Sequence, residues 1–193
     1  MTFSPYYTGS TKSFYCEHLF DSAENAALIK SFTVKQDKGK GLAYFVRELA
    51  EENEMSGENR TYLVKDRNTH ELAGYFALRT GLFTVKISEE DFYTVPSIEL
   101  SNFAVNESYR QSHPDIRKVG TSMFYDFIIP LARLTKTLVG VQALYIYALP
   151  EDRLIEHYES LGFERLEEGG ERFVHQHVKP LYDDGCIFMF QML

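Results

Sequence analysis

Hydrophobic residues recur along this chain at two spacings, and the spacings predict a mixture of strands and helices. Short runs rich in aromatic and β-branched residues, bounded by turn residues, predict strands. Hydrophobic residues three and four positions apart predict helices, as in 42–52, where Leu42, Phe45 and Leu49 share one helical face. Strands are expected at 14–20, 61–65, 71–78, 97–105, 144–149, 163–166 and 186–191, and helices at 23–32, 42–52, 119–138 and 150–161.

The order of these elements predicts one mixed α/β domain over residues 1–193, because no repeat, low-complexity tract or linker interrupts it. Gly57 and Gly162 are expected to end the helices that precede them. Pro130 lies inside the longest predicted helix and cannot donate a backbone hydrogen bond. The helix is therefore expected to bend near Asp126. Residues 81–96 are expected to form a long connection between two strands.

The composition allows a substantial core and argues against a protein that coats nucleic acid. Of 193 residues, 44% are hydrophobic, with 13 Tyr and 15 Phe, so the chain is expected to fold without disulfides. The net charge of −8 opposes binding through an overall positive field, although a local basic patch remains compatible with it. The two cysteines, Cys16 and Cys186, lie in apolar runs and are expected to be buried free thiols.

Several other classes of protein lack support in the sequence. No metal site is expected, since His175 and His177 have no third ligand signalled nearby. The first residues show neither a basic segment nor an apolar run of the secretory type. The longest weakly polar run, 138–150, is too short to span a membrane. A cytoplasmic protein without a membrane segment is the resulting expectation.

A candidate phosphate site lies where the strand 97–105 leads through a loop into the helix that begins near Val119. The first turn of a helix presents unpaired N–H groups and the positive end of the helix dipole. Gly120 permits close approach of a ligand to the backbone, and Arg117 and Lys118 add positive charge. Together these features suit a phosphate or pyrophosphate. The alternative is an ordinary glycine turn flanked by solvated basic residues.

A second candidate is Tyr158, in the helix that Gly162 ends. Leu154, Ile155 and Leu161 lie on the same helical face as Tyr158, so core packing alone would explain the tyrosine. A tyrosine can also place its hydroxyl at the edge of a cleft while its ring packs. In that position it would act as a general acid toward a leaving thiolate.

These segments resemble the GNAT superfamily of acyl-CoA-dependent N-acetyltransferases. The resemblance spans 14–191 and is carried by the strand 99–105, the Arg-x-x-Gly-x-Ser turn at 117–122 and the Tyr-Glu-Ser-Leu-Gly-Phe sequence at 158–163. It implies an α/β (α+β) GNAT fold, with a mixed, mostly antiparallel sheet of about seven strands and about four helices. The fourth and fifth strands are expected to splay apart.

The resemblance also implies a site for acetyl-CoA as cosubstrate. The family motif is (Q/R)-x-x-G-x-(G/A), which Arg117 and Gly120 match, while Ser122 replaces its last small residue. The pantetheine arm is expected to pair with the backbone of 103–105 like an added strand. Because the loop before the motif is long, Arg110 is an alternative to Arg117 as the phosphate contact. The expected cofactor-binding residues are Phe103, Ala104, Val105, Arg110, Arg117, Lys118, Val119, Gly120, Thr121, Ser122 and Met123.

The reaction implied is direct attack of an amine on the thioester of acetyl-CoA. Glu99 is the candidate general base, with a chain of water molecules as the alternative base and a solvent-facing or lysine-paired glutamate as the alternative interpretation. A backbone N–H near Val105 would polarise the carbonyl oxygen. Tyr158 would protonate the leaving thiolate. The catalytic residues expected are thus Glu99 and Tyr158.

The acceptor is the least determined part of the prediction. The loop sequence Glu89-Glu90-Asp91 is either an acidic rim for a cationic amine or a solvated loop, and Phe83, Phe92 and Tyr93 could line an acceptor pocket. A small-molecule or protein amine is the main expectation. The alternatives are a toxin-type enzyme that acetylates aminoacyl-tRNA and a non-catalytic acyl-CoA-binding or interaction module. A homodimer is compatible with the resemblance, but no interface is apparent. The tRNA alternative is kept open by a basic stripe, which consists of Arg110, Arg117, Lys118, Arg133 and Lys136.

Overall fold

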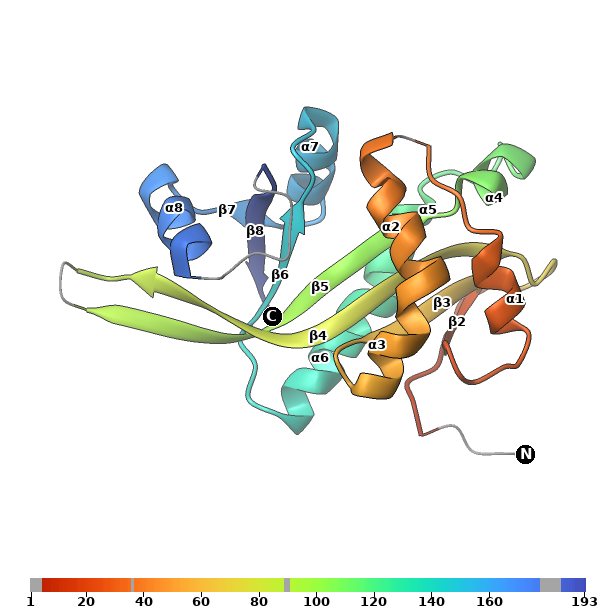
Figure 1. Cartoon of the computed structure of the whole chain (residues 1–193), viewed down its shortest axis with the longest axis horizontal. Coiled ribbons are helices and arrows are strands. Elements are labelled where there is room, and N and C mark those ends of the chain that lie inside the picture. The colour runs from red at the N-terminus through yellow and green to blue at the C-terminus, as the bar shows by residue number, and fades with distance from the viewer. Residues whose placement is uncertain (1–4, 36, 89–90, 178–184) are drawn as a thin grey trace. The chain divides into compact units, whose positions relative to one another are not determined.

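The computed structural model describes residues 5–35, 37–88, 91–177 and 185–193. The chain divides into two compact units, one of Met1–Arg79 with Ser101–Leu131 and the other of Thr80–Leu100 with Ala132–Leu193. The long strands β4 and β5 and the helix α6 run from one unit into the other (Figure 1).

Eight strands are hydrogen-bonded in the order β1-β2-β3-β4-β5-β6-β8-β7, so the mixed α/β class is confirmed with eight rather than seven strands. The pair β5–β6 is parallel, and the described registers of the other pairs are antiparallel. The register of β5 with β6 covers 97–99 against 143–145, although β5 continues to Val105 and β6 to Ala148. This short pairing agrees with the expected splaying of the fourth and fifth predicted strands.

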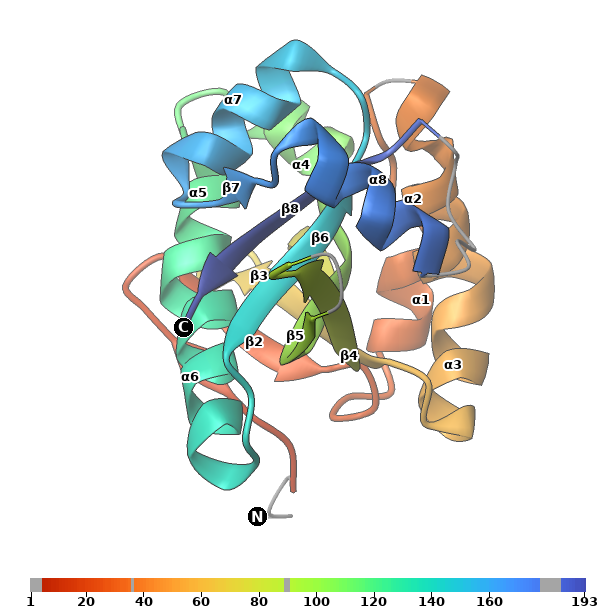
Figure 2. The same ribbon diagram turned by 90° about the vertical axis from the view of Figure 1, so that its left-hand side faces the viewer.

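In the first unit, an antiparallel set of strands is covered by helices on both faces (Figure 2). Helices α1 to α3 pack on one face over a core that includes Phe32, Val46 and Tyr75. The helix that starts with α5 lies on the other face (Figure 2). The elements are β1 Gly9–Ser10, β2 Phe14–His18, α1 Asn25–Lys30, a 3₁₀ turn Asp37–Gly39, α2 Lys40–Tyr44, α3 Ala50–Ser56, β3 Arg60–Asp66, the first part of β4 Leu72–Lys86, α4 Glu107–Ser112 and α5 Val119–Met123.

Two of the long helices contain a widened π-helical turn. One is Phe45–Leu49, between α2 and α3, and Gly57 ends that helix in the left-handed conformation with φ 80°, as expected. The other is Phe124–Ile128, between α5 and α6 (Ile129–Leu138). The second π turn includes Asp126. Pro130 has no N–H to bond the Asp126 carbonyl, so the predicted irregularity is present and takes the form of a wider turn.

In the second unit, β6 and β8 form a central antiparallel pair, and α8 packs beside β8. The core here is largely aromatic and includes Phe83, Tyr145 and Phe188 with Val174 of α8. Gly162 follows α7 with φ 93°, as expected for a helix end. The elements are the hairpin of β4 and β5 (Phe92–Val105), β6 Ala143–Ala148, α7 Asp152–Ser160, β7 Glu164–Arg165, α8 Glu168–His177 and β8 Ile187–Met192.

Three expectations about the elements were wrong. The predicted connection 81–96 is mostly strand, because β4 reaches Lys86 and β5 begins at Phe92. The aromatic and β-branched residues Phe83, Thr84 and Val85 were available as a strand signal. Helices α4 and α8 were not predicted, since both are short and polar, and two glycines lie in α8. The helical segments therefore exceed the four expected. None of the described helices is long and apolar enough to cross a membrane.

Candidate active site

The predicted phosphate site in the first unit begins with an unusual backbone conformation. Lys118 precedes α5 in the left-handed region, at φ 59° and ψ 32°. The first helical hydrogen bond there runs from the Ser122 N–H to the Lys118 carbonyl, at 3.0 Å. The N–H groups of Val119, Gly120 and Thr121 consequently have no helical carbonyl to bond. The predicted set of donors for an anion is therefore present at this helix start.

The positive charges beside these N–H groups are exposed. Arg117 and Lys118 are both exposed and form no ion pair within the described part of the chain. Arg110 lies on α4 and is paired with Glu107, with 3.6 Å between Arg110 Nη1 and Glu107 Oε2. Arg117 is therefore the better placed of the two arginines, because it adjoins α5 and has no competing carboxylate.

One glycine brings the helix start and the end of β5 together. A Cβ atom on Gly74 would lie 2.6 Å from Met123 Sδ and 2.7 Å from the Ala104 carbonyl oxygen. Met123 is fully buried, so its side chain packs in the core, while its backbone is part of α5. The two predicted cofactor-binding segments, 103–105 and 119–123, thus approach each other across Gly74 in the first unit.

Asn106 fixes the end of β5. Its side-chain N–H donates to the Leu72 carbonyl at 2.9 Å, and its side-chain oxygen accepts from the Thr33 N–H at 3.1 Å. Tyr109, one turn into α4, donates its hydroxyl to Asp66 at 2.6 Å. These buried contacts hold the strand end, whose residues Phe103, Ala104 and Val105 are themselves only partly buried.

The candidate base, Glu99, lies in the second unit on β5. It is 3% exposed, and the Tyr145 hydroxyl donates a hydrogen bond of 3.0 Å to its Oε2. The parallel register places Glu99 directly opposite Tyr145 of β6. The interpretation of Glu99 as a solvent-facing strand residue is therefore wrong, because the carboxyl group is buried and hydrogen-bonded.

The candidate acid, Tyr158, lies in α7 of the same unit. It is buried, and its ring meets Phe163 edge to face with 5.6 Å between centroids. A phenol is already protonated at neutral pH, and burial raises the pKa of Tyr158 further above its usual range, which makes it a weaker proton donor. A protonated phenol is the form that a general acid requires.

Other residues considered from the sequence have structural explanations. Phe83 is fully packed in the aromatic core of the second unit and does not line an open acceptor pocket. Phe92 stacks on Phe173 of α8, and the Tyr93 hydroxyl bonds the Gln142 side chain. The acidic loop residues Glu89 and Glu90 lie outside the described residues. Cys16 and Cys186 are both buried and neither is in a disulfide, as expected.

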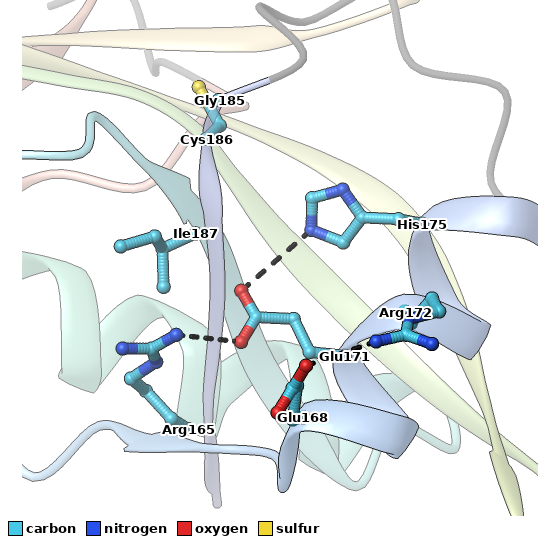
Figure 3. A pocket seen from close by; sticks show the side chains of 8 residues that line it. All are labelled: Arg165, Glu168, Glu171, Arg172, His175, Gly185, Cys186 and Ile187. Carbon is cyan, nitrogen blue, oxygen red and sulfur yellow. Dashed lines mark hydrogen bonds and ion pairs between the residues drawn. The ribbon is translucent and has the colours of Figure 1, made fainter.

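A shallow polar pocket of about 390 Å³ opens beside α8 and β8 (Figure 3). Glu171 lies between Arg165, at 2.8 Å, and His175, at 4.0 Å, while Arg172 pairs with Glu168 at 3.0 Å. Both arginines are thus neutralised by carboxylates, so the pocket lacks the unpaired positive charge of the 117–118 segment. No group of three or more His, Cys, Asp or Glu among the described residues is arranged to bind a metal. The remaining lining residues are Gly185, Cys186 and Ile187.

Comparison with known proteins identifies the fold through structure and not through sequence. No protein-family model and no curated protein matches the chain. The mutant AtaT toxin (tyrosine to phenylalanine) bound to the AtaR C-terminus and acetyl-CoA superposes with a TM-score of 0.65 at 17% identity, covering 93% of this chain and 92% of that one. A tyrosine-to-phenylalanine mutant of KacT has a TM-score of 0.66 at 17% identity, and the match covers 94% of this chain and 95% of that one. AtaT complexed with acetyl-methionyl-tRNAfMet has a TM-score of 0.62 at 17% sequence identity, and the match covers 91% of this chain and 93% of that one.

The chain has the GNAT fold. The fold predicted from the Arg117–Ser122 turn and the residues around Tyr158 is thereby confirmed over nine tenths of the chain. The GNAT motifs did not reveal Gly74, which lies beside the predicted cofactor-binding segments in the first unit, or Tyr145, which donates to Glu99 in the second unit. Their contacts join segments distant in the sequence, so no local pattern marks them. An aromatic residue in a buried strand, such as Tyr145, is otherwise typical of core packing.

Proposed function

We propose that this protein is an acetyl-CoA-dependent N-acetyltransferase whose acceptor is the α-amino group of an aminoacyl-tRNA. The observation that carries this proposal is the similarity, over nine tenths of both chains, to AtaT in complex with acetyl-methionyl-tRNAfMet. It favours the toxin-type alternative over the small-molecule or protein amine that was the main expectation from the sequence. The exposed Arg110, Arg117 and Lys118 supply local positive charge for RNA despite the net charge of −8.

Acetyl-CoA is proposed to bind along the two segments that meet across Gly74. Of the predicted segment 119–123, the N–H groups of Val119, Gly120 and Thr121 would hold the pyrophosphate, because the Ser122 N–H already bonds the Lys118 carbonyl. Arg117 and Lys118 would neutralise the charge of the pyrophosphate. The backbone of 103–105 would pair with the pantetheine arm. This assignment is supported by the first N–H groups of α5, which precede the first helical hydrogen bond, and by the AtaT structure that contains acetyl-CoA.

Glu99 and Tyr158 are proposed to move the two protons of the reaction. The amine nitrogen attacks the thioester carbonyl carbon, forming a C–N bond, and its proton passes to Glu99. The tetrahedral intermediate then breaks its C–S bond, and the departing sulfur takes the Tyr158 proton. The products are the N-acetylated acceptor and the free thiol of CoA. Exchange with solvent removes the proton from Glu99 and returns one to Tyr158.

The class of acceptor determines what fraction of the amine is already unprotonated, and so whether a base must deprotonate it before it attacks. An α-amino group with a pKa of about 7.8 is roughly one-fifth unprotonated at pH 7.2. A lysine-like amine with a pKa of about 10.4 is unprotonated to less than about 0.1% at that pH. Glu99 would therefore mainly accept the proton released during attack on an α-amine.

The experiment is transfer of radiolabelled acetyl groups from acetyl-CoA to a mixture of charged tRNAs. Label is expected in acid-precipitable tRNA, and alkaline hydrolysis should release N-acetyl amino acids. The same mixture deacylated beforehand should take up none, since it lacks the α-amine. Absence of label from every charged tRNA, with transfer to small amines instead, would falsify the proposal.

The second candidate function is acetylation of a small-molecule or protein amine. It is favoured by the acidic composition, because a net charge of −8 attracts a cationic amine and repels RNA. Release of CoA thiol with a panel of polyamines, amino sugars and lysine peptides tests it under the same conditions. A non-catalytic acyl-CoA-binding module would release thiol with neither panel.

A further inference from the structure

The buried hydrogen bond between Tyr145 and Glu99 is built into the second unit by two neighbouring strands. The parallel register of β5 and β6 sets the two residues opposite each other, and the Tyr145 hydroxyl donates to Glu99 Oε2 at 3.0 Å. Both residues are 3% exposed. In a site shielded from water, such a contact controls the direction of the carboxyl group more strongly than at the surface.

Aromatic neighbours hold the Tyr145 ring. Phe83 meets it edge to face at 5.9 Å between centroids, and Tyr147 does so at 6.0 Å. Phe188 packs against it at 5.5 Å with the ring planes tilted by 35°. Because these contacts restrict both side-chain torsions of Tyr145, its hydroxyl is presented in one direction.

Gly81 supplies the space that this hydroxyl occupies. A Cβ atom on Gly81 would lie 2.2 Å from Tyr145 Oη and 2.8 Å from both Cε1 and Cζ. The ring cannot move aside freely, since it packs against Phe83, Phe188 and Tyr147. Any side chain at position 81 would therefore displace the hydroxyl from its place beside Glu99.

We infer that Tyr145 is a positioning residue, seated against Gly81, that holds the Glu99 carboxylate in the orientation in which it takes the proton of the acceptor amine. This inference rests on the proposed function. A carboxylate has about four lone-pair sites, so it can accept from Tyr145 and still accept a proton. A general base acts only within hydrogen-bonding reach of that proton, so fixing its direction raises the rate of the chemical step.

The test compares Tyr145→Phe, Glu99→Gln and the double variant with the wild type, using acetyl-CoA and the mixture of charged tRNAs. Tyr145→Phe should lower kcat about tenfold, and Glu99→Gln about a hundredfold. The KM for acetyl-CoA should stay unchanged in both. The double variant should match Glu99→Gln alone, because Tyr145 has no carboxylate left to orient. If Tyr145 had a purely structural role, Tyr145→Phe would instead lower kcat by the same factor in the wild type and in the Glu99→Gln variant.

Two further variants test the part assigned to Gly81. Gly81→Ala should lower kcat as much as Tyr145→Phe does. The double variant Gly81→Ala with Tyr145→Phe should have the same kcat as Tyr145→Phe alone. Gly140→Ala is the matched control, since a Cβ there meets nothing within 4 Å. Tyr147→Phe controls for loss of a hydroxyl from the same strand. Both controls should retain wild-type kcat.

The outcomes separate this inference from the proposed function. If the wild type acetylates no charged tRNA, the proposed function fails and the inference falls with it. If Glu99→Gln slows the wild-type reaction but Tyr145→Phe does not, the inference alone is overturned. If Glu99→Gln leaves kcat unchanged, Glu99 is not the base. The inference is then overturned while the acceptor assignment stands.

Discussion

Met123 covers Gly74 so closely that a methyl group on Gly74 would lie 2.6 Å from the Met123 sulfur. The same methyl group would lie 2.7 Å from the backbone oxygen of Ala104. A methionine side chain can adapt to a new neighbour, but a backbone carbonyl in a strand cannot move without shifting the strand. This contact therefore sets how α5 lies against the end of β5.

Gly74→Ala is expected to lower the free energy of unfolding by about 1–3 kcal/mol, because the added methyl overpacks this contact. It should also weaken CoA binding, since both proposed cofactor segments shift. Urea unfolding and titration calorimetry with CoA measure the two effects. Gly41→Ala is the control in the same unit: its Cβ would meet nothing within 4 Å, and it lies in a helix. That control should raise stability by about 0.5–1 kcal/mol.

Lys118→Gly is expected to raise the free energy of unfolding relative to Lys118→Ala by about 1 kcal/mol. Both variants remove the same charge, but only alanine keeps a Cβ in the left-handed conformation that Lys118 adopts. Urea unfolding of the pair isolates the backbone strain. Their CoA affinities should be equally reduced if the lysine charge contacts phosphate. Equal stabilities for the two variants would show that this backbone conformation is not strained.

Arg117→Ala is expected to weaken CoA binding about tenfold, the effect of losing a charge-assisted hydrogen bond to phosphate. Arg110→Ala should change it by less than about twofold, because Arg110 is a half-exposed residue paired with Glu107. Calorimetric titration with CoA compares the two variants directly. The reverse order of effects would assign the phosphate contact to Arg110, the alternative left open by the long loop before α5.

Tyr158→Phe is expected to lower kcat by at least about a hundredfold, because the departing thiolate loses its proton donor. CoA affinity and the melting temperature should change little, since the ring that packs on Phe163 remains. Tyr44→Phe, an exposed tyrosine outside the site, is the control. An unchanged kcat in Tyr158→Phe would show that the tyrosine only fills the core.

Stability is expected to fall as the pH rises above about 9, the ordinary pKa range of thiols and then of phenols, because the buried Cys16 thiol and several buried phenols keep their protons in the folded state. Burial raises the pKa values of Tyr62, Tyr75 and Tyr158 in the folded state. Above the ordinary phenol pKa, the unfolded chain loses protons that the folded chain keeps, so unfolding becomes easier by at most about 1.4 kcal/mol per pH unit for each group. Urea unfolding between pH 8 and pH 11 measures the slope, and Tyr158→Phe should reduce it. A flat profile would mean that these phenols ionise in the folded protein.

The local pattern of residues was enough to predict most elements and the helix start at Val119. Periodicity, helix-ending glycines and the isolated Pro130 act through neighbours in the sequence. Strands such as β6 (Ala143–Ala148) and the irregular turn around Asp126 could therefore be anticipated. Short polar helices such as α8 were not predicted, because their stability depends on packing. In α8, Val174 is buried in the aromatic core of the second unit.

The sequence by itself determined the mixed α/β class and the pattern of residues around Gly120 that suits a phosphate, because both depend on residue types at fixed local spacing. The roles of Glu99 and Tyr158 were expected from the resemblance to the GNAT superfamily. Only the tertiary structure decided that Glu99 is buried against Tyr145, that Gly81 makes room for that hydroxyl and that Gly74 joins the two proposed cofactor segments. These are contacts between residues up to 64 positions apart, from Gly81 to Tyr145. They exist only once strand register and packing bring the side chains together.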